Sequence, residues 1–108
     1  MTLIVDGMNV IGSRPDGWWR DRRGAQRALA QALGDLGEPV TVVFDGRPHP
    51  IDAPAGVEVA FAPVADDEIA ARAGPGVRVV TSDRGLIDRV RAAGAEVEPS
   101  KPFRERLG

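Results

Sequence analysis

Residues 3–12 read LIVDGMNVIG, and this stretch decides the fold. The three apolar residues from Leu3 to Val5 are typical of a strand that is covered on both faces, and Asp6 follows them directly. Asn9 lies three positions beyond the acid. A bare carboxylate at the end of a buried strand is difficult to solvate, so the first question is what makes Asp6 tolerable there.

The composition indicates one small domain spanning residues 1–108. The chain has 108 residues and no cysteine, which excludes disulfides, thiolate metal sites and cysteine nucleophiles. Its formal net charge of -2 argues against a protein that coats nucleic acid by bulk positive charge, although local basic patches remain compatible with it. The chain shows no signal-peptide pattern and no run long enough to span a membrane, so we expect a cytoplasmic protein without a membrane partner.

Apolar runs alternate with segments of helical period along the chain. Steps of three and four from Ala25 to Leu36 predict one helix, which Gly34 or Gly37 ends. Shorter helices are predicted before Gly74 and before Gly94. The predicted strands are the runs 3–5, 40–44, 57–61, 77–80 and, more weakly, 95–97.

This alternation predicts a three-layer α/β/α sandwich with a mostly parallel sheet and helices on both faces. One connection fits poorly, because residues 45–56 carry no helical pattern between two strands expected to be parallel. We expect little regular structure in the turn from Gly46 to Gly56 and in the basic tail of about residues 99–108.

Acidic residues follow the ends of four predicted strands: Asp6, Asp45, the pair Asp66 and Asp67, and Asp83. The carboxyl ends of parallel strands share one edge of the sheet, so these carboxylates should converge. Crowded carboxylates must either take up protons or bind a cation. Oxygen ligands without cysteine suit Mg²⁺ or Mn²⁺ better than zinc, which predicts a divalent metal site that shares the charge of Asp6.

Each of these acids also has an ordinary structural explanation. Asp45 fits a turn, Asp83 or Ser82 fits the N-cap of the last predicted helix, and negative charge at Asp66 or Asp67 suits the first turn of a helix. Four acids at four corresponding strand ends are expected less often by chance than any one of them, which favours a shared site.

The ordered segments LIVDGMNVIG, VTVVFDG, VADDEIAA and VRVVTSDRGLIDRVRAAGAEV resemble the NYN domains of the PIN-like nuclease superfamily, especially its bacterial YacP-like group. The resemblance covers almost the whole chain. It implies a Rossmann-like sheet of strand order 3-2-1-4-5 and metal-dependent ribonuclease activity. The chain departs from the family by being shorter between the second and fourth strands.

The resemblance also implies site residues. Asp6 matches the first acid of the family, Asn9 its companion, and Asp83 the acid of the Thr-Ser-Asp step. Asp66 matches the acid that opens the central helix, although the neighbouring Asp67 leaves the register open by one residue. Asp45 matches a less constant acid. Asp6, Asp66 and Asp83 are thus the expected metal ligands, with Asp67 and Asp45 as further candidates, and Asn9 would orient Asp6 or a water without adding charge.

Contacts with RNA are harder to assign. Arginine suits phosphate recognition, but a solvated helix face explains a run of arginines equally well. Trp18 and Trp19 are adjacent, so one should pack inside while the other remains free to stack a base or to enter a protein interface, and Trp18 is the candidate for contact with RNA. His49, between two prolines, fits a solvated loop better than an acid or base. The basic candidates are Arg14, Arg20, Arg22, Arg23, Arg27 and Arg84, together with Lys101, Arg104 and Arg106 in the tail.

The expected reaction is hydrolysis of an RNA phosphodiester by a water that one or two Mg²⁺ or Mn²⁺ ions activate. The main alternative is a catalytically inactive RNA-binding or protein-interaction module on the same fold, with a homodimer, a ribosome or another protein as partner. A phosphoaspartate phosphatase is a weaker alternative, because such enzymes need a second acid two residues after the first, where this chain has Met8.

Overall fold

A computed structural model describes residues 1–108. Five parallel strands form one sheet in the order β3-β2-β1-β4-β5, as the resemblance implied. The strands are β1 (Thr2–Asp6), β2 (Val40–Asp45), β3 (Val57–Ala62), β4 (Val77–Val80) and β5 (Glu96–Glu98). The helices are α1 (Gly7–Gly12), α2 (Arg22–Leu33), α3 (Ala65–Arg72), α4 (Arg84–Ala92) and α5 (Ser100–Leu107), and short 3₁₀ turns lie at Trp18–Arg20 and Gly34–Leu36.

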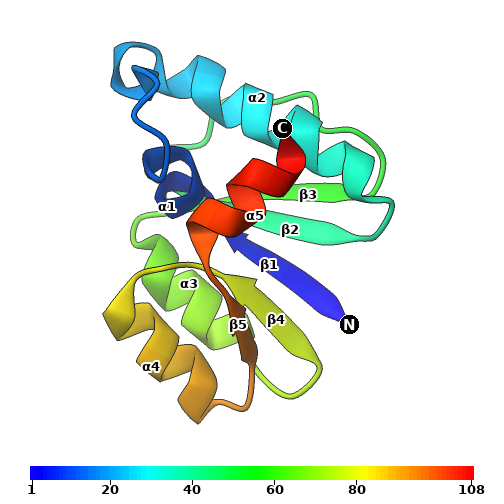
Figure 1. The fold of residues 1–108 in the computed structure, drawn as a ribbon, viewed down its shortest axis with the longest axis vertical. Coiled ribbons are helices and arrows are strands. Elements are labelled where there is room, and N and C mark those ends of the chain that lie inside the picture. The colour runs from blue at the N-terminus through cyan, green and yellow to red at the C-terminus, as the bar shows by residue number, and fades with distance from the viewer.

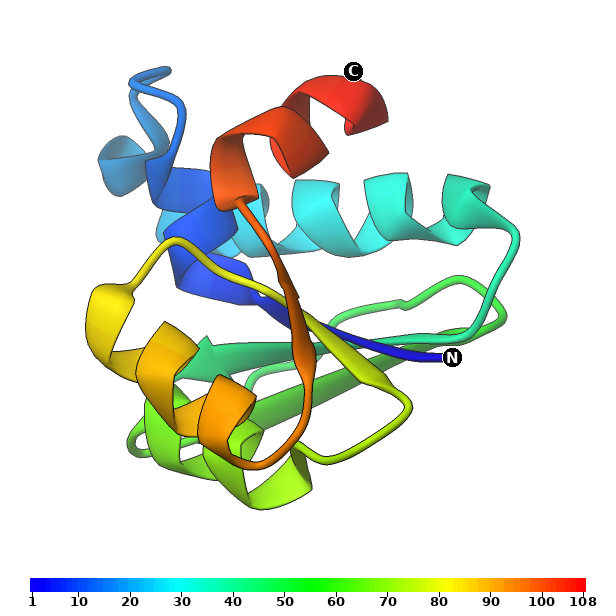
Figure 2. The ribbon, with the colours of Figure 1, turned by 60° about the horizontal axis from the view of Figure 1, so that its bottom comes forward.

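Helices cover both faces of the sheet, which gives the predicted three-layer sandwich (Figure 1). Figure 2 shows α1, α2 and α5 on one side and α3 and α4 on the other. Alternation along β1 divides the core accordingly: Leu3 and Val5 pack toward α1, α2 and α5, whereas Ile4 packs toward α3 and α4. No helix is long and apolar enough to cross a membrane.

The connection from β2 to β3 needs no helix because it lies against α2. The amide Nε2 of Gln31 donates to the backbone carbonyl of Asp52 at 2.6 Å, and Ile51 packs against the core on that side. The backbone N–H of Val57 then donates to the carbonyl of Pro54 at 3.1 Å, where β3 begins. The two strands pair in parallel over their whole length, so the predicted sheet holds at the connection that fitted it least.

The expectation of little regular structure after Pro99 is wrong. Residues 100–107 form α5, and Phe103 is fully buried in the core between β1, α1 and α2. Two apolar residues, Phe103 and Leu107, lie one helical turn apart and both pack against that core. Burial of this pair stabilises a segment whose remaining residues are mostly charged.

Helix α1 begins immediately after β1, and Gly7 makes this possible. Gly7 is buried, and a Cβ at this position would overlap the ring of Phe44 and come within 2.9 Å of the carbonyl oxygen of Val43. The chain therefore turns from strand to helix directly beside β2. As a result Asp6 ends the strand, and Asn9 lies in the first turn of the helix.

Candidate functional site at the carboxyl edge of the sheet

The carboxylate of Asp6 lies at the carboxyl end of β1, on the face of the sheet that α3 and α4 cover. It continues the alternation of Ile4, and only 4 % of the residue is exposed. The Oγ1 hydroxyl of Thr81 donates to its Oδ2 at 2.8 Å. Burial raises the pKa of Asp6 from 3.8 to about 6, although the Thr81 hydrogen bond acts in the opposite direction.

Thr81 joins Asp6 to Asp83. The same Thr81 hydroxyl accepts a hydrogen bond from the backbone N–H of Asp83 at 3.1 Å. The Oδ1 of Asp83 accepts from the backbone N–H of Leu86 at 2.9 Å, so Asp83 is the N-cap of α4. The sequence had left this position open between Ser82 and Asp83. Capping uses one carboxylate oxygen and leaves Oδ2 of Asp83 without a partner in the chain.

Asp45 and Asp66 approach the same place from β2 and α3. The Oδ1 of Asp45 accepts from the backbone N–H of Ala65 at 2.8 Å, which holds the start of α3 beside the end of β2. Asp66 is half-buried, and its pKa is raised by burial and then by the charges of Asp83 and Asp45. The charges of Asp66, Asp45 and Asp83 also raise the pKa of Asp6, so the four carboxylates lie close enough to repel one another.

Asp67 lies outside this group. Its Oδ1 accepts from Nη1 of Arg89 at 2.9 Å, and 68 % of its side chain is exposed. Of the two neighbouring acids, Asp66 is therefore the one that faces the other carboxylates. The surface pair of Asp67 with Arg89 links α3 to α4 and leaves the four-carboxylate group without an ion pair of its own.

Asn9 connects two loops and makes no hydrogen bond with Asp6. Its Oδ1 accepts from the backbone N–H of Ser82 at 2.9 Å and from the hydroxyl of Ser100 at 2.6 Å. The backbone N–H of Ser100 donates in turn to Oγ of Ser82 at 2.9 Å. This network holds the beginning of α5 against the loop that carries Asp83. It leaves the Nδ2 amide group of Asn9 without a hydrogen-bond partner in the chain.

The site offers oxygen donors that form no ion pair, although the charge of Arg89 acts on Asp66 and lowers its pKa. None of Asp6, Asp45, Asp66 and Asp83 has a lysine or arginine within ion-pair distance. As the side chains stand, no three acidic or histidine groups are arranged to hold a metal ion directly. Mg²⁺ commonly takes one or two protein carboxylates and keeps several waters, so this donor set fits such an ion without a complete direct cage.

The predicted RNA-contacting residues divide between the surface and the core. Trp18 is half-buried against the core, and Trp19 is 55 % exposed, so one tryptophan packs inside as expected. Arg22 lies over the ring of Trp18 at 5.8 Å. Among the other basic candidates, Arg20, Arg23, Arg27, Arg84, Lys101 and Arg106 are exposed, and Arg14 and Arg104 are half-buried.

His49 is not the solvated loop residue that we expected. Its Nε2 forms a hydrogen bond with Oε1 of Gln26, and its ring packs against Phe61 at 5.1 Å between centroids. The Nδ1 atom is buried without a partner. The two prolines that flank His49 are exposed, so the contact with α2 is made by the histidine itself.

Sequence reasoning missed two residues that organise the edge, Thr81 and Ser100. Thr81 follows the buried strand β4, two residues after Val79, which faces α3 and α4. Side chains two positions apart on a strand face the same side, so the sequence indicated that Thr81 lies on the face of Asp6. Ser100 had no such signal, because its partner Asn9 lies 91 positions away and their contact depends on where α5 packs.

Comparison with known proteins gives a structural match. No protein-family model matches the chain, and no curated protein matches its sequence. Two crystal structures of Rae1 (YacP) from Bacillus subtilis, one of them a single-residue mutant, match with a TM-score of 0.79 each. They are 25 % identical (the mutant) and 24 % identical to this chain, and the matches cover 99 % of it and 74 % and 73 % of the respective Rae1 chains. The chain therefore has a YacP-like fold.

Proposed function

We propose that this protein is a ribonuclease that depends on Mg²⁺ or Mn²⁺. The observation that carries the proposal is that four carboxylates from four separate segments lie at one edge, with no cationic side chain in an ion pair with any of them. A bound divalent cation relieves such repulsion. The YacP-like fold and the resemblance of the motifs to NYN domains support RNA as the substrate.

Asp6, Asp66 and Asp83 would hold the ion, directly or through water, with Asp45 as a further ligand. Asp6 supplies the buried end of the site, whereas Asp45 and Asp83 are exposed and each keep one free oxygen. When bound, the ion lowers the pKa of a water and stabilises charge on the phosphate oxygens. Thr81 keeps Asp6 in one orientation. The unpaired amide N–H groups on Nδ2 of Asn9 would donate to a phosphate oxygen or a water.

The test is cleavage of single-stranded and structured RNA in the presence of Mn²⁺. We expect Asp6→Asn and Asp66→Asn to reduce the rate at least about 100-fold, because each removes a charged oxygen ligand. Asp67→Asn is the matched control, since it changes the adjacent residue of the same helix turn and should retain the rate within about threefold. Cleavage that survives Asp6→Asn would rule out this site.

The alternative, a catalytically inactive RNA-binding or protein-interaction module, makes a different prediction for metal binding. Titration of the protein with Mn²⁺ by calorimetry should give heat with the wild type and none with Asp6→Asn. RNA binding without any metal-dependent heat or cleavage would favour the inactive module.

A further inference from the structure

Three neighbouring cavities lead away from the acidic edge along the seam between α1 and α5. The first has a volume of about 390 Å³ and begins at Asn9 and Ser82, next to Asp83. The second, of about 160 Å³, shares Ser13 and Lys101 with the first. These two cavities are therefore neighbours on either side of Ser13 and Lys101.

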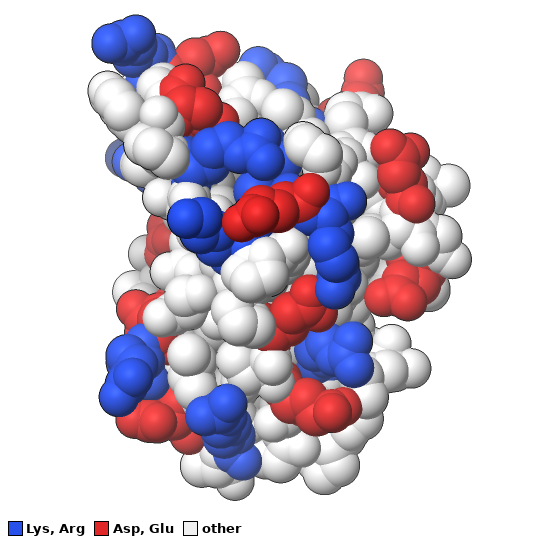
Figure 3. Space-filling view, viewed as in Figure 1, with Lys and Arg blue, Asp and Glu red and all other residues white.

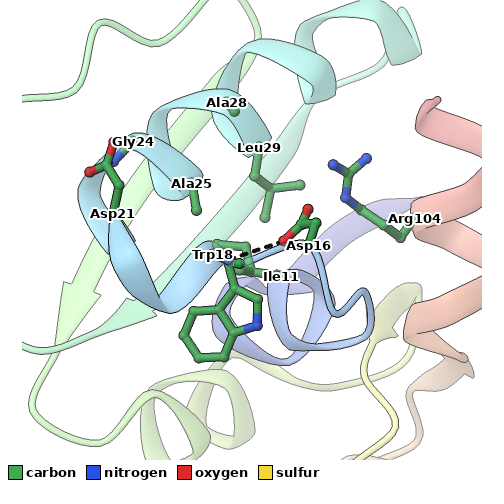
Figure 4. Close-up of a pocket in the computed structure, with 10 residues that line it drawn as sticks. Ile11, Asp16, Trp18, Asp21, Gly24, Ala25, Ala28, Leu29 and Arg104 are labelled. Atoms are coloured by element: carbon green, nitrogen blue, oxygen red, sulfur yellow. Dashed lines mark hydrogen bonds between the residues drawn. The ribbon is translucent and has the colours of Figure 1, made fainter.

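The third cavity has a volume of about 270 Å³ and shares Arg104 with the second. Figure 4 shows Arg104 reaching from α5 toward this cavity, with Asp16 between it and Trp18. The backbone N–H of Trp18 donates to Oδ1 of Asp16 at 3.2 Å, which holds the carboxylate at the cavity wall. Leu29 and Ile11 supply the apolar part of the lining.

Cations along this seam lack acidic partners. Arg14, Lys101 and Arg104 form no ion pair within 4.0 Å, whereas Arg72 and Arg89 on the opposite side of the sheet are paired with acids. Burial, and then the charge of Arg14, lower the pKa of Arg104, while the charge of Asp16 acts in the opposite direction. The seam therefore holds two arginines that repel each other, which is the condition that an anion relieves.

Acids also line this seam, Glu105 in the second cavity and Asp16 and Asp21 in the third. Glu105 lines the second cavity together with Arg14, Lys101 and Arg104, and it has no ion-pair partner. In Figure 3 lysine and arginine side chains gather over the region of α5, with acidic side chains among them. The second cavity is positive on balance, with three cations against Glu105, whereas the third has Arg104 against Asp16 and Asp21.

We propose that this seam binds single-stranded RNA that extends from the acidic edge, with phosphates on Lys101, Arg14 and Arg104 and a base in the third cavity against Trp18. The substrate class rests on the proposed function. Cationic grooves that end on an aromatic ring suit single strands, because stacking on the ring requires an unpaired base. The carboxylate of Asp16 can accept from the amino or imino groups of such a base.

Binding without cleavage tests the phosphate contacts. Anisotropy of a labelled single-stranded RNA, without divalent metal, is measured in the Asp6→Asn background. We expect Lys101→Glu to raise Kd about five- to tenfold and to lower the slope of log Kd against log salt by about 0.7, the value for one phosphate contact on a single strand. Glu105→Gln should lower Kd about twofold, because it removes the acid that lines the second cavity together with these cations.

The matched control is Arg91→Glu, which changes the net charge by the same amount on the exposed surface of α4. It should alter Kd less than twofold. Equal affinities of the Lys101→Glu and Arg91→Glu proteins overturn the proposed path, and so does the absence of any RNA binding in the Asp6→Asn background.

Fluorescence tests the far end of the path. The chain has two tryptophans and no tyrosine, so Trp19→Phe leaves Trp18 as the only indole. Saturating RNA should quench this emission, and it should have a much smaller effect on the Trp18→Phe protein. An unchanged Trp18 signal with bound RNA overturns the base site. RNA binding as expected, without Mn²⁺-dependent cleavage by the wild type, would contradict the proposed function and leave the path standing.

Discussion

At the scale of the residue, the surroundings of Asp6 explain how a strand of apolar side chains can end in an acid. The carboxylate is buried, receives one hydrogen bond from Thr81, and lies within the repulsive field of Asp45, Asp66 and Asp83. An arrangement of this kind costs stability in the free protein, and a site that binds a cation recovers that cost when the cation is present.

The raised pKa of Asp6 predicts a stability change with pH. In the folded protein Asp6 keeps its proton up to about pH 6, and its ordinary pKa is 3.8. Folding thus takes up a proton between these values, so the contribution of neutral Asp6 is fully present below about pH 4 and is lost as the pH rises through 6. The shift corresponds to at most about 3 kcal/mol of the free energy of unfolding.

Asp6→Asn measures this contribution, because the amide oxygen can still accept from Thr81 and carries no charge. By urea denaturation, we expect Asp6→Asn to be more stable than the wild type by about 1–3 kcal/mol at pH 7.5, with a smaller difference at pH 4.5. A variant that is less stable than the wild type at both pH values would contradict the burial of a charged Asp6.

At the scale of the element, α5 shows that two apolar residues are enough for a helix when the rest of the fold provides a core and hydrogen-bond partners for it. Phe103 is fully buried, and Leu107 packs one turn later against the same core. The first residue, Ser100, is held at both its backbone N–H and its hydroxyl, by Ser82 and Asn9. The partners in these contacts lie far from the segment in sequence. The segment's own composition, which is mostly charged, therefore predicted little regular structure.

Phe103→Ala should therefore destabilise the whole protein and not only its last helix. Loss of a fully buried phenylalanine costs about 3–5 kcal/mol, because the cavity adds to the lost transfer free energy. Chemical denaturation measures the change, and Glu105→Ala on the exposed side of the same helix should stay within about 0.5 kcal/mol of the wild type. A cost below about 1 kcal/mol would mean that α5 contributes little to the fold.

At the scale of the whole molecule, the topology converts separate segments into one site. Parallel pairing of all five strands brings their carboxyl ends to a single edge, and the start of α3 and of α4 lies at that edge on the same face as Asp6. The other face carries α1 and α5, whose seam starts from the same edge. A cation at the edge would therefore bind only the folded chain.

Mn²⁺ should thus raise the melting temperature in proportion to its binding. At a free concentration of 100 times Kd the gain is about 2.7 kcal/mol, which for a domain of this size corresponds to a rise of about 10 °C or more. Thermal denaturation followed by circular dichroism gives the measurement, with Asp6→Asn as the control that should not respond. An equal rise in both proteins would place the bound metal elsewhere.

The local sequence was sufficient for the strands and for the helices α2, α3 and α4, because each depends on periodicity, and it limited the cap of α4 to Ser82 or Asp83. It also placed the acids at strand ends. The choice between Asp66 and Asp67 stayed open at the level of the sequence. It depends on how α3 lies against α4, where Arg89 pairs with Asp67.

By itself the sequence determined the five strands, the helices α2, α3 and α4, and which acids follow the strands, since these properties come from neighbours a few positions apart. Only the tertiary structure decided that Asn9 meets Ser100, that Thr81 links Asp6 to Asp83, and that the tail folds as α5. The reason is physical: contacts between distant segments depend on strand order and on which apolar surfaces pack together, and no local period encodes either of these.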